Sequence, residues 1–366
     1  MVSVTPVVGM SREQVRRYLG DEHSGLRFPR PRSGVSGFRV LYRTISVTGR
    51  PTTASGVVVL PRDTAGALQA VSFAHGTHAG RGTAGSVAAD GQSRVAAVYY
   101  AAAGYAGVAP DYLGLGVGAG KHPYMDAASE ASASLDMLRA ARTVAGREGR
   151  KLDRRVLVTG FSQGGQAAMA LGRQLQRGAD PYLQLGALAP VSGPYDLRYV
   201  QIPASLQGSL DPRVSAFNLA YATVSWNRLY HLYDSPSEVF RAPYDTTVER
   251  LFDGSHDEED IFPQLPASPE KLMTSRYSDW LAHPSGALLR AIRAADGTCD
   301  WAPRVPIRLY GASGDEQVAF GNTQNCLRAL RAHGARPQVV DYGDAGHFDT
   351  LYRGLSGTLR WFRTLP

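Results

Sequence analysis

Short apolar runs alternate with stretches of helical spacing along most of the chain. The apolar runs lie at residues 70–74, 106–109, 156–159, 185–193, 305–311 and 338–342. The helical spacing is clearest in residues 127–147, where Leu135, Leu138 and Val144 fall on one stripe. Strands that alternate with helices in this way are typical of a mostly parallel sheet with helices on both faces. The predicted fold class is therefore α/β.

The segment before residue 70 has a different pattern. Residues 38–60 contain two alternating apolar runs on either side of the turn Thr48-Gly49-Arg50-Pro51, which predicts an antiparallel hairpin at the edge of the sheet. Residues 11–32 predict one helix followed by a loop rich in Pro and Arg. We therefore interpret residues 1–37 as an N-terminal extension made of a helix and a loop.

The alternation of strands and helices is interrupted before residue 303. The interrupting segment has helical and irregular character and is rich in Tyr, Phe and Trp. We interpret residues 198–302 as an inserted cap or lid, which leaves 38–197 and 303–366 as the first and second parts of the core. The acidic run at 257–260 is interpreted as a solvated face of this cap.

A serine stands at the sharpest turn that the sequence predicts. Ser162 is the centre of Gly160-Phe161-Ser162-Gln163-Gly164, which follows the apolar run at 156–159 and precedes an Ala-rich helix at 166–176. A G-x-S-x-G sequence between a strand and a helix is typical of a nucleophile elbow, whose two glycines allow a very tight turn. The N–H groups at the start of the helix point toward developing negative charge. We expect Ser162 to be a nucleophile, and an inert serine in a tight turn is the alternative.

An aspartate and a histidine follow later strands of the same predicted sheet. Asp315 comes after the run at 305–311 and His347 after the run at 338–342, so both should lie at the edge that carries Ser162. A serine hydroxyl needs a base to take its proton, and the imidazole needs a carboxylate to orient it and balance its charge. Ser162, His347 and Asp315 are therefore the predicted catalytic residues. Asp196 and Glu316 stay open as alternatives to Asp315.

Two backbone N–H groups are expected to stabilise the negatively charged oxygen of a tetrahedral intermediate. One belongs to Gln163, directly after the serine. The second should come from the loop after the run at 70–74, where His75-Gly76-Thr77 lets the backbone approach closely. We assign this second oxyanion-hole donor to Thr77, with Gly76 as the alternative.

Histidine and cysteine spacing gives no indication of a metal or a cofactor, and none is expected. His75 and His78 lack further ligands at a suitable spacing, and His75 is interpreted as a residue that orients its loop. His122 is interpreted as a surface or loop histidine. Cys299 and Cys326 are two reduced thiols, or they pair across a predicted strand if the compartment is oxidising.

Composition excludes several classes of function. The chain has 366 residues, of which 43% are hydrophobic, as in a globular protein. The net charge of +7 rests almost entirely on arginine, and the arginines are scattered, so we expect no nucleic-acid partner. No apolar run is long enough to span a bilayer, and residues 1–9 lack the features of a secretory signal. We therefore expect a cytoplasmic location, although an export signal that had been removed would leave no trace in this sequence. The sequence does not indicate an oligomeric state.

The chain resembles the α/β-hydrolase superfamily, and within it the secretory-lipase-like branch of lipase A type. The segments that carry the resemblance are His75-Gly76-Thr77, residues 104–116 with Asp111-Tyr112-Leu113-Gly114-Leu115-Gly116, His122-Pro123-Tyr124, Gly160–Gly165 and the loops of Asp315 and His347. The resemblance implies an α/β-hydrolase fold with an inserted helical cap and no cofactor. It also implies a serine carboxylic-ester hydrolase that forms an acyl-enzyme. The aromatic residues of the predicted cap indicate a small apolar or ring-bearing acyl ester as the partner, with simple packing of these residues as the alternative.

Two other functions stay open. Members of this branch are typically exported, whereas this chain shows no export signal. A cytoplasmic relative would suit a biosynthetic pathway, in which the same residues deacylate, lactonise or eliminate acetate from an acylated intermediate. The second alternative is a ligand-binding protein that keeps the fold, although a receptor has no need for a serine, a histidine and an aspartate together.

Overall fold

The computed structural model describes residues 1–21 and 30–366, and the part of the predicted N-terminal loop at residues 22–29 lies outside the described residues. In the described part, nine strands form one sheet in the order β1-β2-β3-β5-β4-β6-β7-β8-β9. The neighbouring strands β1 and β2, β2 and β3, and β3 and β5 are antiparallel. All further neighbours, from β5 and β4 to β8 and β9, are parallel. The strands are β1 (Ser3–Met10), β2 (Val35–Ile45), β3 (Pro51–Pro61), β4 (Leu68–Ala74), β5 (Ala106–Pro110), β6 (Leu152–Phe161), β7 (Gln184–Val191), β8 (Arg308–Gly311) and β9 (Gln338–Asp341).

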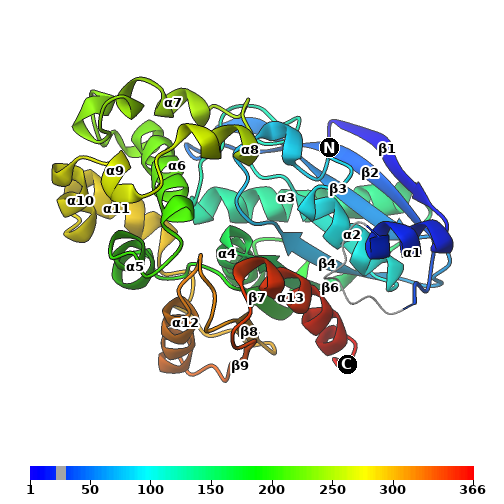
Figure 1. Ribbon diagram of the computed structural model, residues 1–366. Coiled ribbons are helices and arrows are strands. Elements are labelled where there is room, and N and C mark those ends of the chain that lie inside the picture. Colours follow the sequence, from blue (N-terminus) through cyan, green and yellow to red (C-terminus); the bar gives the residue numbers. More distant parts are fainter. Residues whose placement is uncertain (22–29) are drawn as a thin grey trace.

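Helices cover both faces of this sheet, which confirms the predicted α/β class (Figure 1). The α-helices are α1 (Arg12–Asp21), α2 (Gln92–Ala102), α3 (Ala127–Arg147), α4 (Gln163–Gln176), α5 (Ile202–Leu206), α6 (Pro212–Tyr230), α7 (Val248–Leu251), α8 (Glu258–Ile261), α9 (Pro269–Leu272), α10 (Ser275–Ala282), α11 (Gly286–Ala295), α12 (Gly321–Ala332) and α13 (His347–Phe362). Shorter helical turns are η1 (Arg81–Thr83), η2 (Leu197–Gln201), η3 (Pro236–Glu238), η4 (Tyr244–Thr246) and η5 (Phe262–Gln264). Across the described residues, no helix has both the length and the apolar character needed to cross a bilayer.

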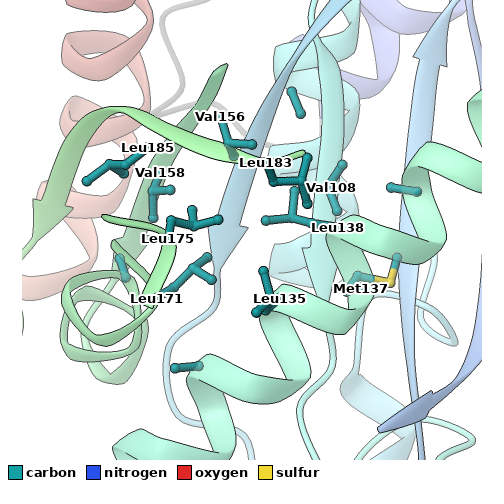
Figure 2. Close-up of a cluster of buried hydrophobic side chains, with 14 of the residues drawn as sticks. Val108, Leu135, Met137, Leu138, Val156, Val158, Leu171, Leu175, Leu183 and Leu185 are labelled. Atoms are coloured by element: carbon teal, nitrogen blue, oxygen red, sulfur yellow. The ribbon is translucent and has the colours of Figure 1, made fainter. Parts of the chain in front are cut away.

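A densely packed core holds β6, the strand that leads to Ser162. Figure 2 shows Val156 and Val158 of β6 in a cluster with aliphatic side chains of α3 and α4. Leu138 of α3 and Leu171 of α4 are almost completely buried in the same cluster. Burying one such side chain contributes about 1.5–3 kcal/mol. The end of β6 therefore has a fixed position relative to both helices.

The strand β1 was not predicted from the sequence. It pairs with β2, so the predicted hairpin of β2 and β3 forms as expected but does not lie at the edge of the sheet. The register of β1 shifts between Pro6 and Val8, and this irregularity breaks the alternation on which a strand prediction depends. Pro6 has no N–H to donate, which an edge strand tolerates.

The helices α5 to α11 lie together between β7 and β8 in the chain, at one end of the molecule (Figure 1). They pack around a separate hydrophobic cluster, which includes Phe217, Tyr221 and Trp226 and also Tyr124 and Met125 from the loop before α3. Many aromatic residues of the segment are thus used for packing. A separate core supports the proposed cap at residues 198–302.

Cys299 and Cys326 form a disulfide, with their Cα atoms 5.3 Å apart and a sequence separation of 27 positions. The sequence left open whether these cysteines are reduced thiols or a disulfide, and in the structure they are paired. The bond joins the loop after α11 to α12, and both cysteines are buried. Disulfides are typical of oxidising compartments. The cytoplasmic location stays a prediction.

Removing this disulfide should lower the free energy of unfolding. A cross-link that closes a loop of this length removes chain entropy from the unfolded state worth about 3–4 kcal/mol. We expect the variant Cys299→Ala/Cys326→Ala to be less stable than the wild type by about this amount in urea unfolding. Dithiothreitol should destabilise the wild type and leave the variant unchanged. Equal stability of the two proteins without reductant would contradict the prediction.

Candidate active site

Ser162 lies at the turn between β6 and α4, with a φ of 57° and a ψ of −124°. This is a strained conformation for a residue with a side chain. A Cβ at Gly160 would overlap the carbonyl oxygen of Gly164, and a Cβ at Gly164 would overlap that of Ala74. Only glycine fits at either position, as expected for a nucleophile elbow.

The structure brings Ser162, His347 and Asp315 together. The Ser162 Oγ lies 3.0 Å from the His347 Nε2, and the His347 Nδ1 lies 2.8 Å from Oδ2 and 3.0 Å from Oδ1 of Asp315. The three residues follow β6, β9 and β8, at the carboxyl ends of parallel strands. Their exposed fractions are only 9%, 3% and 7%. The arrangement fits a hydroxyl that donates to Nε2 while Nδ1–H donates to the carboxylate.

Asp315 is held in place by its own loop. Its Oδ1 accepts the backbone N–H groups of Gln317, at 3.0 Å, and Val318, at 2.9 Å. Glu316, one of the two alternatives, accepts the backbone N–H of His347 at 2.9 Å. Glu316 therefore fixes the backbone of the histidine and not its ring.

Asp196, the other alternative, has different partners. Its carboxylate caps the helical turn η2 by accepting the N–H of Tyr199 at 2.9 Å, and it also accepts from Asn325 Nδ2 at 2.6 Å. In the described part of the chain, the acid bonded to the ring of His347 is Asp315.

The loop after β4 lies against the nucleophile. A Cβ on Gly76 would be 3.4 Å from the Cβ of Ser162, and the N–H of Gly76 already donates to Gln92 Oε1 at 2.7 Å. Within residues 1–21 and 30–366, the N–H groups of Thr77 and Gln163 have no protein acceptor. The expected pair of donors is therefore free, whereas the alternative at Gly76 is engaged.

His75 and the segment after β5 shape this loop. The ring of His75 is fully buried and contacts the carbonyl oxygen of Gly76 through Nδ1 at 2.6 Å. Tyr112 donates its hydroxyl to the carbonyl oxygen of His75 at 3.1 Å. Burial lowers the pKa of His75 to about 3, so the ring is neutral. Among the described residues, no group of His, Cys, Asp and Glu has the arrangement of a metal site.

The side chain of Gln163 is anchored in the interior. Its Nε2 donates to Glu130 Oε1 at 2.6 Å and to His122 Nε2 at 3.0 Å. The interpretation of His122 as a surface histidine is wrong, because it is only 5% exposed, although it does lie in a loop. Glu130 was missed, and the available signal was a carboxylate within the apolar stripe of α3. Burial raises the pKa of Glu130 to about 8 and lowers that of His122 to about 4.

Two cavities meet at Ser162. The smaller has a volume of about 50 Å³ and extends toward α5 and α6, and the larger has a volume of about 510 Å³. Asp257, Glu258 and Glu259 of the predicted solvated run line the larger cavity. Glu258 also accepts the backbone N–H of Ala79 at 2.8 Å, with only 28% of its side chain exposed. The interpretation as a solvated face is therefore wrong for Glu258, because α8 packs against the loop after β4.

No protein-family model matches the sequence, and no curated protein does. Solved structures do match. One is a protein of Legionella pneumophila assigned as a hydrolase, with 26% identity and a TM-score of 0.88 over 99% of this chain and 97% of that one. Another is the rice cell wall degrading esterase LipA of Xanthomonas oryzae, with 27% identity and a TM-score of 0.86 over 100% and 97%.

Candida antarctica lipase A matches with 14% identity and a TM-score of 0.65 over 98% of this chain and 82% of that one, which shows a shared fold. The mostly parallel sheet, the helices on both faces and the turn at Ser162 agree with these relationships. The chain thus has the α/β-hydrolase fold, and its structural neighbours support a lipase-A-like relationship.

Proposed function

We propose that the protein is a serine-dependent carboxylic-ester hydrolase, with Ser162, His347 and Asp315 as its catalytic residues. The observation that carries this proposal is the chain of hydrogen bonds from the Ser162 hydroxyl through the imidazole to the carboxylate. The position of Ser162 at a strained turn before α4 adds support. The esterase activity named for the Xanthomonas oryzae relative supports the same class of reaction.

In the first half of the reaction, Ser162 Oγ attacks the carbonyl carbon of the ester while His347 Nε2 takes the hydroxyl proton. The bond between this carbon and the alkoxy oxygen then breaks, and the proton passes from Nε2 to the leaving alcohol. In the second half, the same nitrogen deprotonates a water molecule that attacks the acyl-enzyme. The carboxylic acid leaves and the serine regains its proton. Asp315 balances the positive charge of the imidazolium in both halves.

The N–H groups of Gln163 and Thr77 would stabilise the oxyanion. The buried partners of the Gln163 side chain hold the first helical residue of α4 in place. Thr77 is held by a hydrogen bond of 3.0 Å between its hydroxyl and that of Tyr124. A donor of this kind typically contributes about 3–4 kcal/mol to the transition state, because it is oriented before charge develops.

The nucleophile is tested by pre-steady-state kinetics with p-nitrophenyl acetate. We expect the wild type to release a burst of p-nitrophenol and Ser162→Ala to show none, with kcat lowered at least about 10⁴-fold because no acyl-enzyme forms. Ser313→Ala is the matched control, since Ser313 lies in another G-x-S triplet and is exposed. A burst that persists in Ser162→Ala would refute this role.

The acid is tested by comparing two isosteric variants. Asp315→Asn should lower kcat about 10⁴-fold, because an amide no longer balances the imidazolium or fixes its tautomer. Asp196→Asn should keep its helix cap and change kcat less than about threefold, since asparagine caps helices as well as aspartate. The assignment fails if Asp196→Asn is the more damaging of the two.

Acid should destabilise the protein through His122, which accepts the hydrogen bond from Gln163 only while it is neutral. Burial lowers its pKa from 6.5 to about 4. Between these values the unfolded chain binds a proton at His122 that the folded chain does not, so the contribution of His122 to the free energy of unfolding falls as the pH falls. The raised pKa of Glu130 gives a contribution of opposite sign, which the comparison with a His122 variant leaves in place. We expect His122→Gln to reduce this slope by up to about 1.4 kcal/mol per pH unit in urea unfolding between pH 7 and 5. An unchanged slope would show that folding does not alter the protonation of His122.

A further inference from the structure

The position of His347 distinguishes the two cavities at Ser162. His347 lines only the larger cavity, and Gln163 lines only the smaller one. In the proposed reaction the leaving alkoxy oxygen must receive its proton from His347 Nε2. The alcohol part of the ester must therefore occupy the larger cavity. With the carbonyl oxygen directed at the Gln163 and Thr77 N–H groups, the smaller cavity is left for the acyl chain.

The acyl cavity is small and mostly apolar. Leu219, Ala222 and Trp226 of α6 form one wall, and Leu197 and Ile202 line it as well. All five are buried, so the cavity cannot lengthen without repacking the cap. Its volume of about 50 Å³ is far smaller than the roughly 510 Å³ of the other cavity. We therefore expect a short acyl group of two to about four carbons to be preferred over an octanoyl chain.

The alcohol cavity has the size and the walls of a site for a ring system. Its volume of about 510 Å³ lies in the range of sites that bind drug-sized ligands. Phe217 and Phe262 of the cap stack with their ring centroids 4.9 Å apart, and both line this cavity. Phe161 and Phe348 line it beside His347, and Phe348 is 57% exposed although its ring is apolar. Flat rings are what such walls bind best.

We propose that this protein cleaves esters of short acyl groups, of two to about four carbons, with bulky ring-bearing alcohols. This inference rests on the proposed function and specifies its substrate class. It places the ring on the alcohol side of the ester and leaves the acyl side small. Both parts follow from the unequal cavities and from the side on which His347 lies.

The wild type is tested with two series of esters, and within each series the acidity of the leaving alcohol is nearly constant. In the first, p-nitrophenyl esters differ in acyl length from acetyl to decanoyl. We expect kcat/KM to fall at least about tenfold between butyryl and octanoyl, which corresponds to about 1.4 kcal/mol. In the second, acetates of phenol, 2-naphthol and 4-phenylphenol differ in the size of the alcohol. We expect kcat/KM to stay level or rise as the alcohol grows.

Variants of α6 test the assignment of the cavities. Leu219→Ala should open the acyl cavity and raise the ratio of octanoyl to acetyl kcat/KM at least about fivefold, with the naphthyl to phenyl ratio unchanged. Ala222→Leu should fill the cavity and lower the ratio of butyryl to acetyl. Leu229→Ala is the matched control, because it makes the same truncation on the same helix but lines neither cavity at Ser162. Its acyl ratios should equal those of the wild type.

The outcomes separate this inference from the function on which it rests. If no ester of either series is cleaved in a Ser162-dependent manner, the proposed function fails. If esters are cleaved through Ser162 but octanoyl esters react as fast as butyryl esters, the short acyl group is refuted and the hydrolase stands. If Leu219→Ala changes the alcohol preference and not the acyl preference, the assignment of the cavities is reversed.

Discussion

The tight turn at Ser162 is the constraint on which the site depends. Gly160 and Gly164 approach so closely that neither position has room for a Cβ, and Gly164 also lies against the backbone of β4. This close packing places the end of β6, the start of α4 and the loop after β4 in contact. The loop that carries Gly76 and Thr77 therefore lies against Ser162. The turn also directs the serine oxygen toward the loops of β8 and β9, which carry Asp315 and His347.

The interior behind this turn is polar, yet it carries little charge. Gln163 is tied to Glu130 and His122, and burial favours the neutral form of both. A neutral network can hold a side chain without the desolvation cost of buried ions. The proposed cap adds the remaining walls of the site. Because most of its apolar side chains pack in a cluster separate from those of the sheet, changes in its lining residues can alter the cavities while the sheet and the turn stay in place.

Local patterns were sufficient to predict most of the sheet, most helices and the positions of Ser162, Asp315 and His347. This was possible because the carboxyl ends of parallel strands meet at one edge, so residues distant in the chain could be assigned to one place. The strand β1 was missed because a register shift interrupts its alternation. Glu130 and Glu258 were missed because their partners lie far away in the sequence, and a carboxylate gives no local sign of what it contacts. The sequence also left the pairing of Cys299 with Cys326 open, because it depends on how two segments separated in the chain are placed in the fold.

The central claim is that His347 and Asp315 make the oxygen of Ser162 nucleophilic. The most direct measurement is peptide mass spectrometry after reaction with a fluorophosphonate, which phosphonylates only activated serines. The account predicts one modified residue, Ser162, and loss of this modification in His347→Gln. Modification of another serine, or of Ser162 at an equal rate in His347→Gln, would contradict it.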